Sequence, residues 1–438
     1  MGHASFARGE YRALAKRLGR GPVAMVEPAD PAARRAWRDI LEILFSPQDA
    51  ALASLLPVVP TAVDGLTRRT GLSAEALRAR LDAMADKGLV LDLRDRRTGA
   101  TVYMLAPPVV GFFEFSMMRL DDGLPKARLA RAYEAYMMGD TDFLEEVSRG
   151  ATVIGRTLAY EATLGEDLVP EVLDWERAAS YVKAADLVSV TNCFCRHAAE
   201  HLGTRCDNPL ETCMSLGTAA AYLIRHDLAR PISREEGLEL LAASRERGLV
   251  HIADNVQQEI SYICNCCPCC CHELRSAQVG LPVVQPSGFQ PACAQERCTG
   301  CGRCVRACPV QAISLVPRSI RRDGGDEPST RLLSRIDLER CLGCGVCVDV
   351  CRESALRMER RPRRPHVPLN SVEAVTRRML ERGRLAELLV DGTAGRGPAF
   401  ANAVLAAVLA LPPAERLLAS EHLQSRFVRF VLSRRQVP

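Results

Sequence analysis

Nineteen cysteines constrain this chain more than any other feature of its sequence. All of them lie between Cys193 and Cys351, and several stand in tight runs such as Cys269 to Cys271. Adjacent cysteines are poorly placed to pair with each other, because a disulfide requires a particular separation of the two Cα atoms. Thiolates that converge on a metal tolerate this crowding. The distribution therefore predicts thiolate-bound metal in a reducing compartment, and we expect a cytoplasmic protein.

The rest of the composition narrows the remaining classes. The 438 residues are 47% hydrophobic and only 5% aromatic, which favours ordinary domain cores over stacking platforms for single-stranded nucleic acid. A formal net charge of +4 is too small to indicate nucleic acid or an anionic membrane by itself. The first residues lack an apolar signal core, and the stretch 399–411 is too short to span a bilayer. We therefore expect no membrane span.

Two four-cysteine repeats carry the most specific motif. Each follows the spacing Cys-x2-Cys-x2-Cys-x3-Cys, and Pro309 follows the first copy. The repeats consist of Cys298, Cys301, Cys304 and Cys308, and of Cys341, Cys344, Cys347 and Cys351. In this spacing a tight loop turns three thiolates toward one iron–sulfur cubane, while the fourth points to a neighbouring cubane. The alternative, a zinc ribbon, uses paired Cys-x2-Cys knuckles without the trailing cysteine.

These repeats resemble the bacterial two-cluster ferredoxin family over about residues 290–357. The resemblance implies two [4Fe–4S] clusters that exchange their fourth ligands. One cluster would take Cys298, Cys301, Cys304 and Cys351, and the other would take Cys341, Cys344, Cys347 and Cys308. Two features depart from the family pattern: Arg352 stands where the second repeat often has proline, and the polar insert 318–331 lengthens the connection. We expect that insert, with its Asp323 to Asp326 turn sequence, to form an exposed hairpin or loop.

Eleven cysteines remain outside the two repeats, enough for at least one further metal centre. They are Cys193, Cys195, Cys206, Cys213, Cys264, Cys266, Cys267, Cys269, Cys270, Cys271 and Cys293. One arrangement is a third cluster that draws ligands from both halves of this set. Its candidate ligands come first from the close pair Cys193 and Cys195 and from the later Cys206 and Cys213. Three more follow the Cys-x2-Cys-x2-Cys spacing, and these are Cys264, Cys267 and Cys270. The alternative for the first four, and for Cys293, is a buried structural thiol.

The cysteine-rich segments also resemble a group of uncharacterised iron–sulfur proteins from anaerobic bacteria. The motifs are Cys193 to Arg196, Cys206 to Cys213, His251 with Asn255, and the run Cys264 to Cys271. The resemblance covers about residues 30–357, and in those proteins the motifs also precede a two-cluster ferredoxin domain. It implies iron–sulfur binding but names no substrate. We interpret His251 as structural, and the pair His197 and His201 as an exposed polar face.

The pattern of helices and turns predicts a multidomain α+β protein. Helices are expected over 32–45, 47–56, 61–70 and 73–87, followed by strands at 89–93 and 101–105, which together are typical of a winged helix. The region after it is predicted to be mainly helical, and residues 285–290 are predicted to form a linker. Residues 371–433 are predicted to form about three amphipathic helices. The predicted domains are a winged helix-like domain over 31–110, a helical cysteine-rich domain over 111–284, a ferredoxin-like domain over 285–359 and a C-terminal helical region over 369–438.

The predicted winged helix carries only a weak electrostatic footprint for DNA. The charges on its second helix cancel, and the wing residues Arg94, Arg96 and Arg97 exceed the neighbouring Asp92 and Asp95 by one. A surface that tracks phosphates needs a larger basic surplus. DNA is therefore the less favoured partner, behind a redox partner protein.

We expect an electron-transfer protein or reductase component, in which electrons hop between the ferredoxin-like clusters and a further cysteine-ligated centre. It would be an oxidoreductase or an oxidoreductase subunit, although the sequence names no reaction. No glycine-rich nucleotide fingerprint is present, so neither flavin nor nicotinamide is predicted. The alternative hypothesis is a redox- or oxygen-sensing winged-helix transcription regulator.

Overall fold

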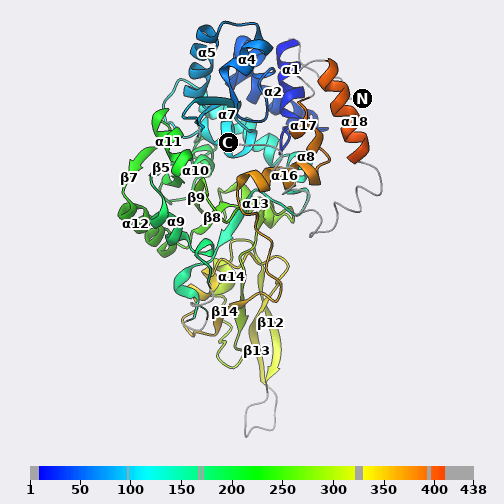
Figure 1. The fold of residues 1–438 in the computed structure, drawn as a ribbon. Coiled ribbons are helices and arrows are strands. Elements are labelled where there is room, and N and C mark those ends of the chain that lie inside the picture. The colour runs from blue at the N-terminus through cyan, green and yellow to red at the C-terminus, as the bar shows by residue number, and fades with distance from the viewer. Residues whose placement is uncertain are drawn as a thin grey trace.

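The computed structural model describes residues 9–95, 98–165, 168, 172–320, 329–391 and 396–409. These residues form a mixed α/β protein of several parts. Helices from both ends of the chain gather at the top of Figure 1, a mixed sheet lies in the middle, and a narrow part with a long hairpin extends below. Among the described helices, none has both the length and the apolar character needed to cross a membrane.

The N-terminal part folds largely along the predicted boundaries. Its elements are α1 (Gly9–Leu18), α2 (Pro31–Leu44), α3 (Pro47–Ala53), β1 (Thr61–Ala62), α4 (Val63–Thr70), α5 (Ala74–Asp86), β2 (Val90–Arg94) and β3 (Thr101–Leu105). Ser73 caps α5 by accepting a hydrogen bond of 3.3 Å from the Ala76 N–H. The strands form a small antiparallel sheet in the order β1-β3-β2. Helix α1 precedes the predicted start of this domain, and it buries Leu14 completely. Arg96 and Arg97 lie outside the described residues.

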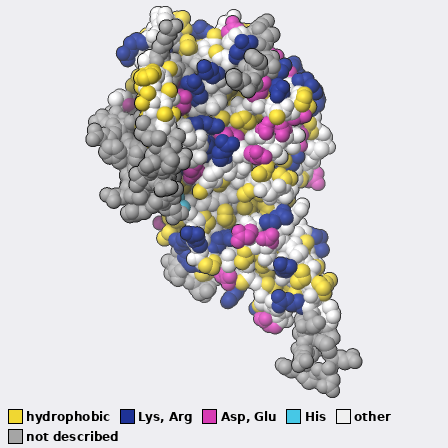
Figure 2. Space-filling view, turned by 90° about the vertical axis from the view of Figure 1, so that its right-hand side faces the viewer, with side chains coloured by type: hydrophobic (Ala, Val, Ile, Leu, Met, Phe, Trp, Pro, Cys, Tyr) yellow, Lys and Arg dark blue, Asp and Glu magenta, His cyan; other side chains and the backbone are white. Residues whose placement is uncertain are grey.

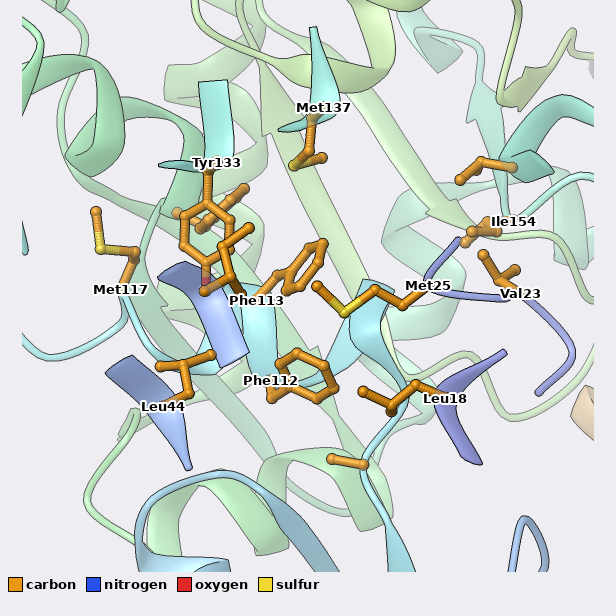
Figure 3. Close-up of a cluster of buried hydrophobic side chains, with 14 of the residues drawn as sticks. Leu18, Val23, Met25, Leu44, Phe112, Phe113, Met117, Tyr133, Met137 and Ile154 are labelled. Carbon is orange, nitrogen blue, oxygen red and sulfur yellow. The ribbon is translucent and has the colours of Figure 1, made fainter. Parts of the chain in front are cut away.

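An aromatic core joins this part to the segment that follows it (Figure 3). That segment contains η1 (Pro108–Phe112), α6 (Phe113–Phe115), α7 (Lys126–Met137) and α8 (Asp142–Ser148). The Phe113 ring lies 5.2 Å from that of Phe112 and 4.9 Å from that of Tyr133, between ring centroids. The same buried cluster contains Leu18 and Leu44 from the N-terminal helices, so the core is continuous across residue 110.

The middle region combines its helices with a seven-stranded sheet, which the prediction of a mainly helical region did not include. The strands are β4 (Gly155–Leu158), β5 (Val188–Asn192), β6 (Glu211–Leu216), β7 (Arg230–Ile232), β8 (Val250–Asp254), β9 (Tyr262–Cys266) and β10 (Val284–Gln285). Their order is β10-β4-β8-β9-β6-β5-β7, and every pair except β10–β4 is antiparallel. The strands are short and largely buried, and such strands lack the alternation that distinguishes a half-exposed strand from a helix segment.

Helices cover this sheet and supply its turns. They are η2 (Glu161–Thr163), η4 (Asp174–Glu176), α9 (Ala178–Ala184), α10 (Phe194–His201), α11 (Gly217–Arg225), α12 (Arg234–Glu246) and α13 (His272–Gln278). Met214 and Ile263, from adjacent strands, share a buried cluster with Val182 of α9 and Leu241 of α12. Because successive strand residues alternate in direction, the neighbouring cysteines of β6 and β9 face the opposite side of the sheet.

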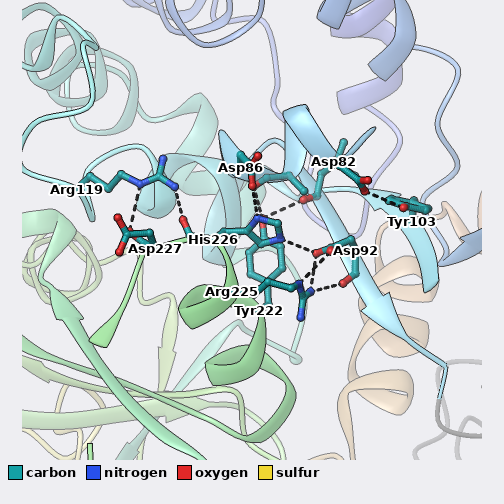
Figure 4. Close-up of polar contacts among 11 residues, drawn as sticks. Asp82, Asp86, Asp92, Tyr103, Arg119, Tyr222, Arg225, His226 and Asp227 are labelled. Atoms are coloured by element: carbon teal, nitrogen blue, oxygen red, sulfur yellow. Dashed lines mark hydrogen bonds and ion pairs between the residues drawn. The ribbon is translucent and has the colours of Figure 1, made fainter. Parts of the chain in front are cut away.

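Helix α11 anchors the N-terminal part to the sheet (Figure 4). The Tyr222 hydroxyl donates to the carbonyl oxygens of Ala85 (3.2 Å) and Val90 (2.9 Å). Arg225 forms an ion pair of 2.7 Å with Asp92. The His226 ring at the end of the helix contacts Asp92 at 2.8 Å with one nitrogen and Asp86 at 2.7 Å with the other. Helix α5 and strand β2 are therefore fixed to the middle region.

The narrow part contains two small antiparallel sheets and two short helices. Its elements are β11 (Phe289–Cys293), α14 (Arg303–Ala307), β12 (Ile313–Ile320), β13 (Ser329–Ile336), α15 (Val346–Asp349) and β14 (Leu356–Arg360). Strand β11 pairs with β14, and β12 pairs with β13. The polar insert thus contributes to a hairpin, although Asp323 to Asp326 lie outside the described residues. The predicted linker 285–290 is half strand, because Gln285 ends β10 and Phe289 begins β11, and only residues 286–288 connect them.

The C-terminal region returns to the N-terminal helices (Figure 1). It contains α16 (Ser371–Glu381), α17 (Leu385–Leu389) and α18 (Arg396–Leu409), which are helices within the range that the prediction made helical. Arg384 forms ion pairs with the buried Glu146 of α8, the closer at 2.5 Å. Asp391 pairs with Arg69 at 2.7 Å. The last predicted residues, 410–438, lie outside the described part of the chain.

Candidate metal centres

The second cysteine repeat and one cysteine of the first repeat enclose a single cavity. It is lined by Cys308, Cys341, Cys344 and Cys347 with apolar residues between them. The ferredoxin resemblance assigned these same four cysteines to one cluster. Cys308 reaches the cavity because α14 ends directly before it and turns the chain toward the second loop. A cubane needs four convergent thiolates, and this cavity supplies them.

The other predicted set lies closer to the surface. Cys351 packs with Cys298 and Cys293 around Leu333, which brings the last ligand of the second repeat to the first. Cys301 is exposed, and backbone N–H donation from Arg303 lowers its pKa. Cys344 of the other set is buried, and burial raises its pKa to about 12. The two sets therefore differ in solvent access, one of the factors that set a cluster's potential.

Glycine is required at two positions in these loops. Gly300 and Gly343 have φ values of +70° and +66°, a region that side chains rarely adopt. A Cβ atom at Gly343 would collide with the carbonyl oxygen of Phe289, and one at Gly300 with that of Leu332. The loops thus lie directly against strands β11 and β13, which fixes where their thiolates point.

Four thiols of the middle region form a first group, which we call the four-thiol group. Their sulfur atoms all lie within 4.8 Å of one another, and they belong to Cys206, Cys267, Cys269 and Cys270. The sulfurs of Cys206 and Cys267 are 3.6 Å apart, and those of Cys206 and Cys270 are 3.8 Å apart. A hydrogen bond from Cys270 lowers the pKa of Cys267 to about 5. Four close thiolates suit a tetrahedral metal ion or one iron–sulfur cluster.

Six further thiols form a second group, the six-thiol ring. Thiol contacts run in a closed circle through Cys193, Cys195, Cys271, Cys266, Cys264, Cys213 and back to Cys193. Hydrogen bonds from two of its neighbours, Cys213 and Cys266, lower the pKa of Cys264 to about 6. The ring joins residues from three parts of the sheet region.

Strand register explains how the six-thiol ring assembles. Cys264 and Cys266 are two residues apart on β9 and therefore share a face. The pairing of Met214 with Ile263 sets Cys213 of β6 beside Cys264. Cys193 and Cys271 are the N-cap residues of α10 and α13, whose first turns face the same region. In α13 the residue after the cap, His272, lies 3.4 Å from the Cys195 sulfur through its Nδ1.

One arginine stands between the two groups. Arg196 is fully buried and donates hydrogen bonds to the carbonyl oxygens of Pro209 (2.9 Å) and Asn265 (2.7 Å). Burial alone would lower its pKa, but the charges of nearby thiolates, with Cys193 first among them, raise it above the usual value. A permanent cation therefore faces thiolates of both groups, which favours their charged, metal-binding form.

Two half-buried carboxyls beside the six-thiol ring, those of Glu273 and Glu114, carried no recognisable signal in the sequence. Glu273 lies within 4.8 Å of the sulfurs of Cys266 and Cys271. Burial raises its pKa well above the usual range, and burial raises that of Glu114 to about 7. Glu273 comes to the ring because it follows the Cys271 cap in the first turn of α13. It is an additional candidate ligand.

The structure distributes the predicted third-centre ligands over both groups. Cys206, Cys267 and Cys270 belong to the four-thiol group, whereas Cys193, Cys195, Cys213 and Cys264 belong to the six-thiol ring. The Cys-x2-Cys-x2-Cys spacing at 264, 267 and 270 therefore does not converge on one point. Strand β9 ends at Cys266, and the chain turns away from the sheet after it.

The remaining candidates lie outside both groups. The Cys293 sulfur accepts a hydrogen bond of 3.0 Å from Ser334 and lies beside Cys298. His251 contacts the Asn265 amide oxygen at 2.6 Å, and burial lowers its pKa to about 4. His197 is buried against the Met117 carbonyl oxygen, 2.7 Å from its Nδ1, and 3.2 Å from His201. His197 therefore does not contribute to an exposed polar face.

The ferredoxin-like part contacts the cysteine-rich part directly. The Gln278 side-chain amide donates to the carbonyl oxygen of Pro268, inside the cysteine run, at 3.1 Å. The same nitrogen donates to the carbonyl oxygen of Pro309, next to Cys308, at 2.8 Å. One side chain thus connects the four-thiol group to the cavity of the buried ferredoxin-like set.

Residues 297–366 match the family model of the 4Fe-4S dicluster domain. This segment is a ferredoxin-type domain, and the cysteine groups beside it suit further metal. No curated protein matches the chain.

Proposed function

We propose that this protein is an electron-transfer protein or a reductase component that carries two [4Fe–4S] clusters in its ferredoxin-type domain. Electrons pass from these clusters to the metal-binding thiols of the middle sheet. The observation that carries this proposal is the direct contact that Gln278 makes with both Pro268 and Pro309. A ferredoxin-type domain attached only by a flexible linker would need no such contact.

The difference in burial suggests the direction of the relay. The cluster held by Cys298, Cys301, Cys304 and Cys351 lies near the surface, where a redox partner protein can approach the exposed Cys301. The cluster in the buried cavity stands between that surface and the middle region. When bound, the clusters supply one-electron redox chemistry. The chain itself supplies the ligands, excludes water and fixes the spacing.

The four-thiol group is the proposed first acceptor in the middle region. It stands at the Gln278 contact, and Cys269 is exposed while its three partners are more buried. A third iron–sulfur cluster in this group would extend the relay, whereas a zinc ion would end it because zinc is redox-inactive. Metal analysis of the isolated protein separates these two cases.

The transcription-regulator alternative has less support. Several charged groups of α5 and its flanks already have partners inside the chain: Lys87 pairs with Asp49 at 2.8 Å, and Asp86 contacts His226. On the face in Figure 2, basic and acidic side chains are interspersed over the part of the chain that the structure describes. Phosphate recognition needs a concentrated basic surface. Gel-shift assays of holo and air-treated protein with promoter DNA would reveal a regulator as cluster-dependent binding.

The decisive test is stepwise anaerobic reduction of the full, reconstituted chain with a low-potential donor, followed by electron paramagnetic resonance. We expect signals from two reduced [4Fe–4S] clusters, followed by electron uptake in the middle region. A matched variant, Cys206→Ala with Cys267→Ala, should retain the first two signals and lose any signal from the four-thiol group. Clusters that take up no electrons would refute the proposal.

A further inference from the structure

The six-thiol ring divides into two halves of three thiols each. Each half contains a Cys-x-Cys pair and one more cysteine from another element. The halves are Cys193, Cys195 and Cys213, and Cys264, Cys266 and Cys271. Only two thiol contacts join them, one between Cys195 and Cys271 and the other between Cys213 and Cys264. The ring is therefore two three-thiol units that meet along a shared edge.

The number of thiols is wrong for the simpler centres. A structural zinc ion takes four ligands, and a [4Fe–4S] cubane also takes four. Six thiolates exceed either requirement by two. They match a centre of two linked cubane-like units, in which three thiolates hold each unit and bridging atoms complete the remaining position on each. The three-plus-three division of the ring has this symmetry.

The position of the ring also separates it from the four-thiol group. Cys266 and Cys267 are adjacent in the chain, yet Cys266 contacts Cys264 and Cys271 whereas Cys267 lies with Cys206 and Cys270. Strand β9 ends between them, so the two side chains enter different groups. The ring cysteines Cys193, Cys266 and Cys271 are only 7%, 6% and 4% exposed. The other three, Cys195, Cys213 and Cys264, are partly buried. The protein therefore restricts the access of water and oxidants to the ring, and large iron–sulfur centres are sensitive to both.

We propose that the six-thiol ring binds one double iron–sulfur centre, distinct from any metal in the four-thiol group. Its iron–sulfur character rests on the proposed function, since the ferredoxin-type domain supplies the electrons that such a centre would store. Glu273, beside Cys266 and Cys271, offers an oxygen ligand to one half. Among the described residues, no carboxylate is grouped in this way with Cys193, Cys195 and Cys213. The two halves are therefore chemically unequal.

The test begins with the wild-type chain, purified without air from iron-supplied cells. Anomalous scattering from its crystals at the iron, zinc and copper edges identifies the metal in the ring without any substitution. We expect iron at the ring, at about eight atoms for two cubane-like units. Zinc or copper there, a single four-iron cluster, or an empty ring would each overturn the proposal.

Two double variants add a solution measurement. Cys213→Ala with Cys264→Ala removes one contact between the halves, and the chain should lose about eight irons while the ferredoxin-type signals persist. The control, Cys206→Ala with Cys269→Ala, alters only the four-thiol group and should leave the ring iron in place. Equal losses from both variants would show a shared centre and contradict the proposal.

Failure of this inference differs from failure of the proposed function. Reducible ferredoxin-type clusters beside a ring that contains zinc would leave the electron-transfer proposal intact and refute the double centre. A ring that contains iron, beside ferredoxin-type clusters that accept no electrons, would support the double centre and refute the electron-transfer proposal. If a variant fails to fold, the wild-type anomalous scattering still decides the identity of the ring metal.

Discussion

The backbone N–H of Tyr160 donates a hydrogen bond of 3.1 Å to the carbonyl oxygen of Cys344. The same tyrosine is buried, and its hydroxyl donates to the Leu249 carbonyl oxygen at 2.6 Å. Leu249 in turn packs with Cys267 and Cys270 of the four-thiol group. A ligand loop of the ferredoxin-type domain is thus connected to the cysteine-rich region through one residue that follows β4. Together with Gln278, Tyr160 therefore joins the two regions at a second point.

Gln278→Glu should weaken this interface. Glutamate has the same shape but donates no hydrogen bond when ionised, so the carbonyls of Pro268 and Pro309 lose their donor. We expect a stability loss of about 1–3 kcal/mol and slower electron transfer into the middle region. Stopped-flow reduction and urea unfolding measure both effects. Gln295→Glu, the same change where the amide contacts only the exposed Arg318, is the control and should change neither.

The proposed exchange of fourth ligands between two clusters predicts an unusual pattern of iron loss. Cys351→Ala should remove the cluster of the first repeat, at a cost of about four irons per chain. Adding Cys301→Ala should cost no further iron, because both residues serve the same cluster. Adding Cys344→Ala to Cys351→Ala should remove the second cluster as well, with a loss of about four more irons per chain. If the pair Cys351 and Cys344 loses only one cluster, the ligands are not interleaved.

Gly343→Ala tests the contact between the ligand loop and β11. The new Cβ would collide with the Phe289 carbonyl oxygen, and the residue would also keep a positive φ. Gly203→Ala is the matched control, since its φ is +72° but nothing lies within 4 Å of the added atom. The control should lose about 1–2 kcal/mol from backbone strain alone. Gly343→Ala should lose about 1–3 kcal/mol more and release the buried cluster, as measured by denaturation and iron analysis.

Arg196→Met should destabilise the fold and reduce metal uptake by both thiol groups. The substitution removes the hydrogen bonds to Pro209 and Asn265 from a buried site, and with them the positive charge that faces the thiolates. We expect a loss of about 3–5 kcal/mol in the free energy of unfolding. Arg205→Met breaks only the exposed ion pair with Glu200 and should cost less than about 1 kcal/mol. Comparable losses in the two variants would contradict the assigned role of Arg196.

The anchor between α11 and the N-terminal part should depend on pH. Burial opposes protonation of His226, but hydrogen bonds to Asp92 and Asp86 outweigh it and raise the His226 pKa. A raised folded-state pKa stabilises the fold fully below the unfolded value of about 6.5. That contribution is lost as pH rises through the folded-state pKa. The protection of α5 against hydrogen exchange, corrected for the intrinsic rise of amide exchange with pH, should therefore fall from about pH 6 to pH 9. In His226→Gln this protection should not change with pH beyond that correction.

The sequence by itself determined the features that depend on short stretches of chain. The spacing Cys-x2-Cys-x2-Cys-x3-Cys closes a loop within about ten residues, so local geometry is enough to bring three thiolates together. The predicted helices and strands between 32 and 105 agree with the structure for the same reason, because caps such as Ser73 act on neighbouring residues. The family match over 297–366 confirms the ferredoxin-type domain.

Tertiary structure decided how the remaining cysteines are grouped. Adjacent residues Cys266 and Cys267 enter different groups, whereas Cys195 and Cys271 meet although they are far apart in the chain. These outcomes depend on the strand order β8-β9-β6-β5, which no local spacing encodes. The short buried strands were not predicted from the sequence, because a strand buried on both faces lacks the alternation of polar and apolar residues that identifies a half-exposed strand. Thiolate chemistry is therefore visible in sequence, while the partners of each thiol are fixed only when the sheet aligns its strands.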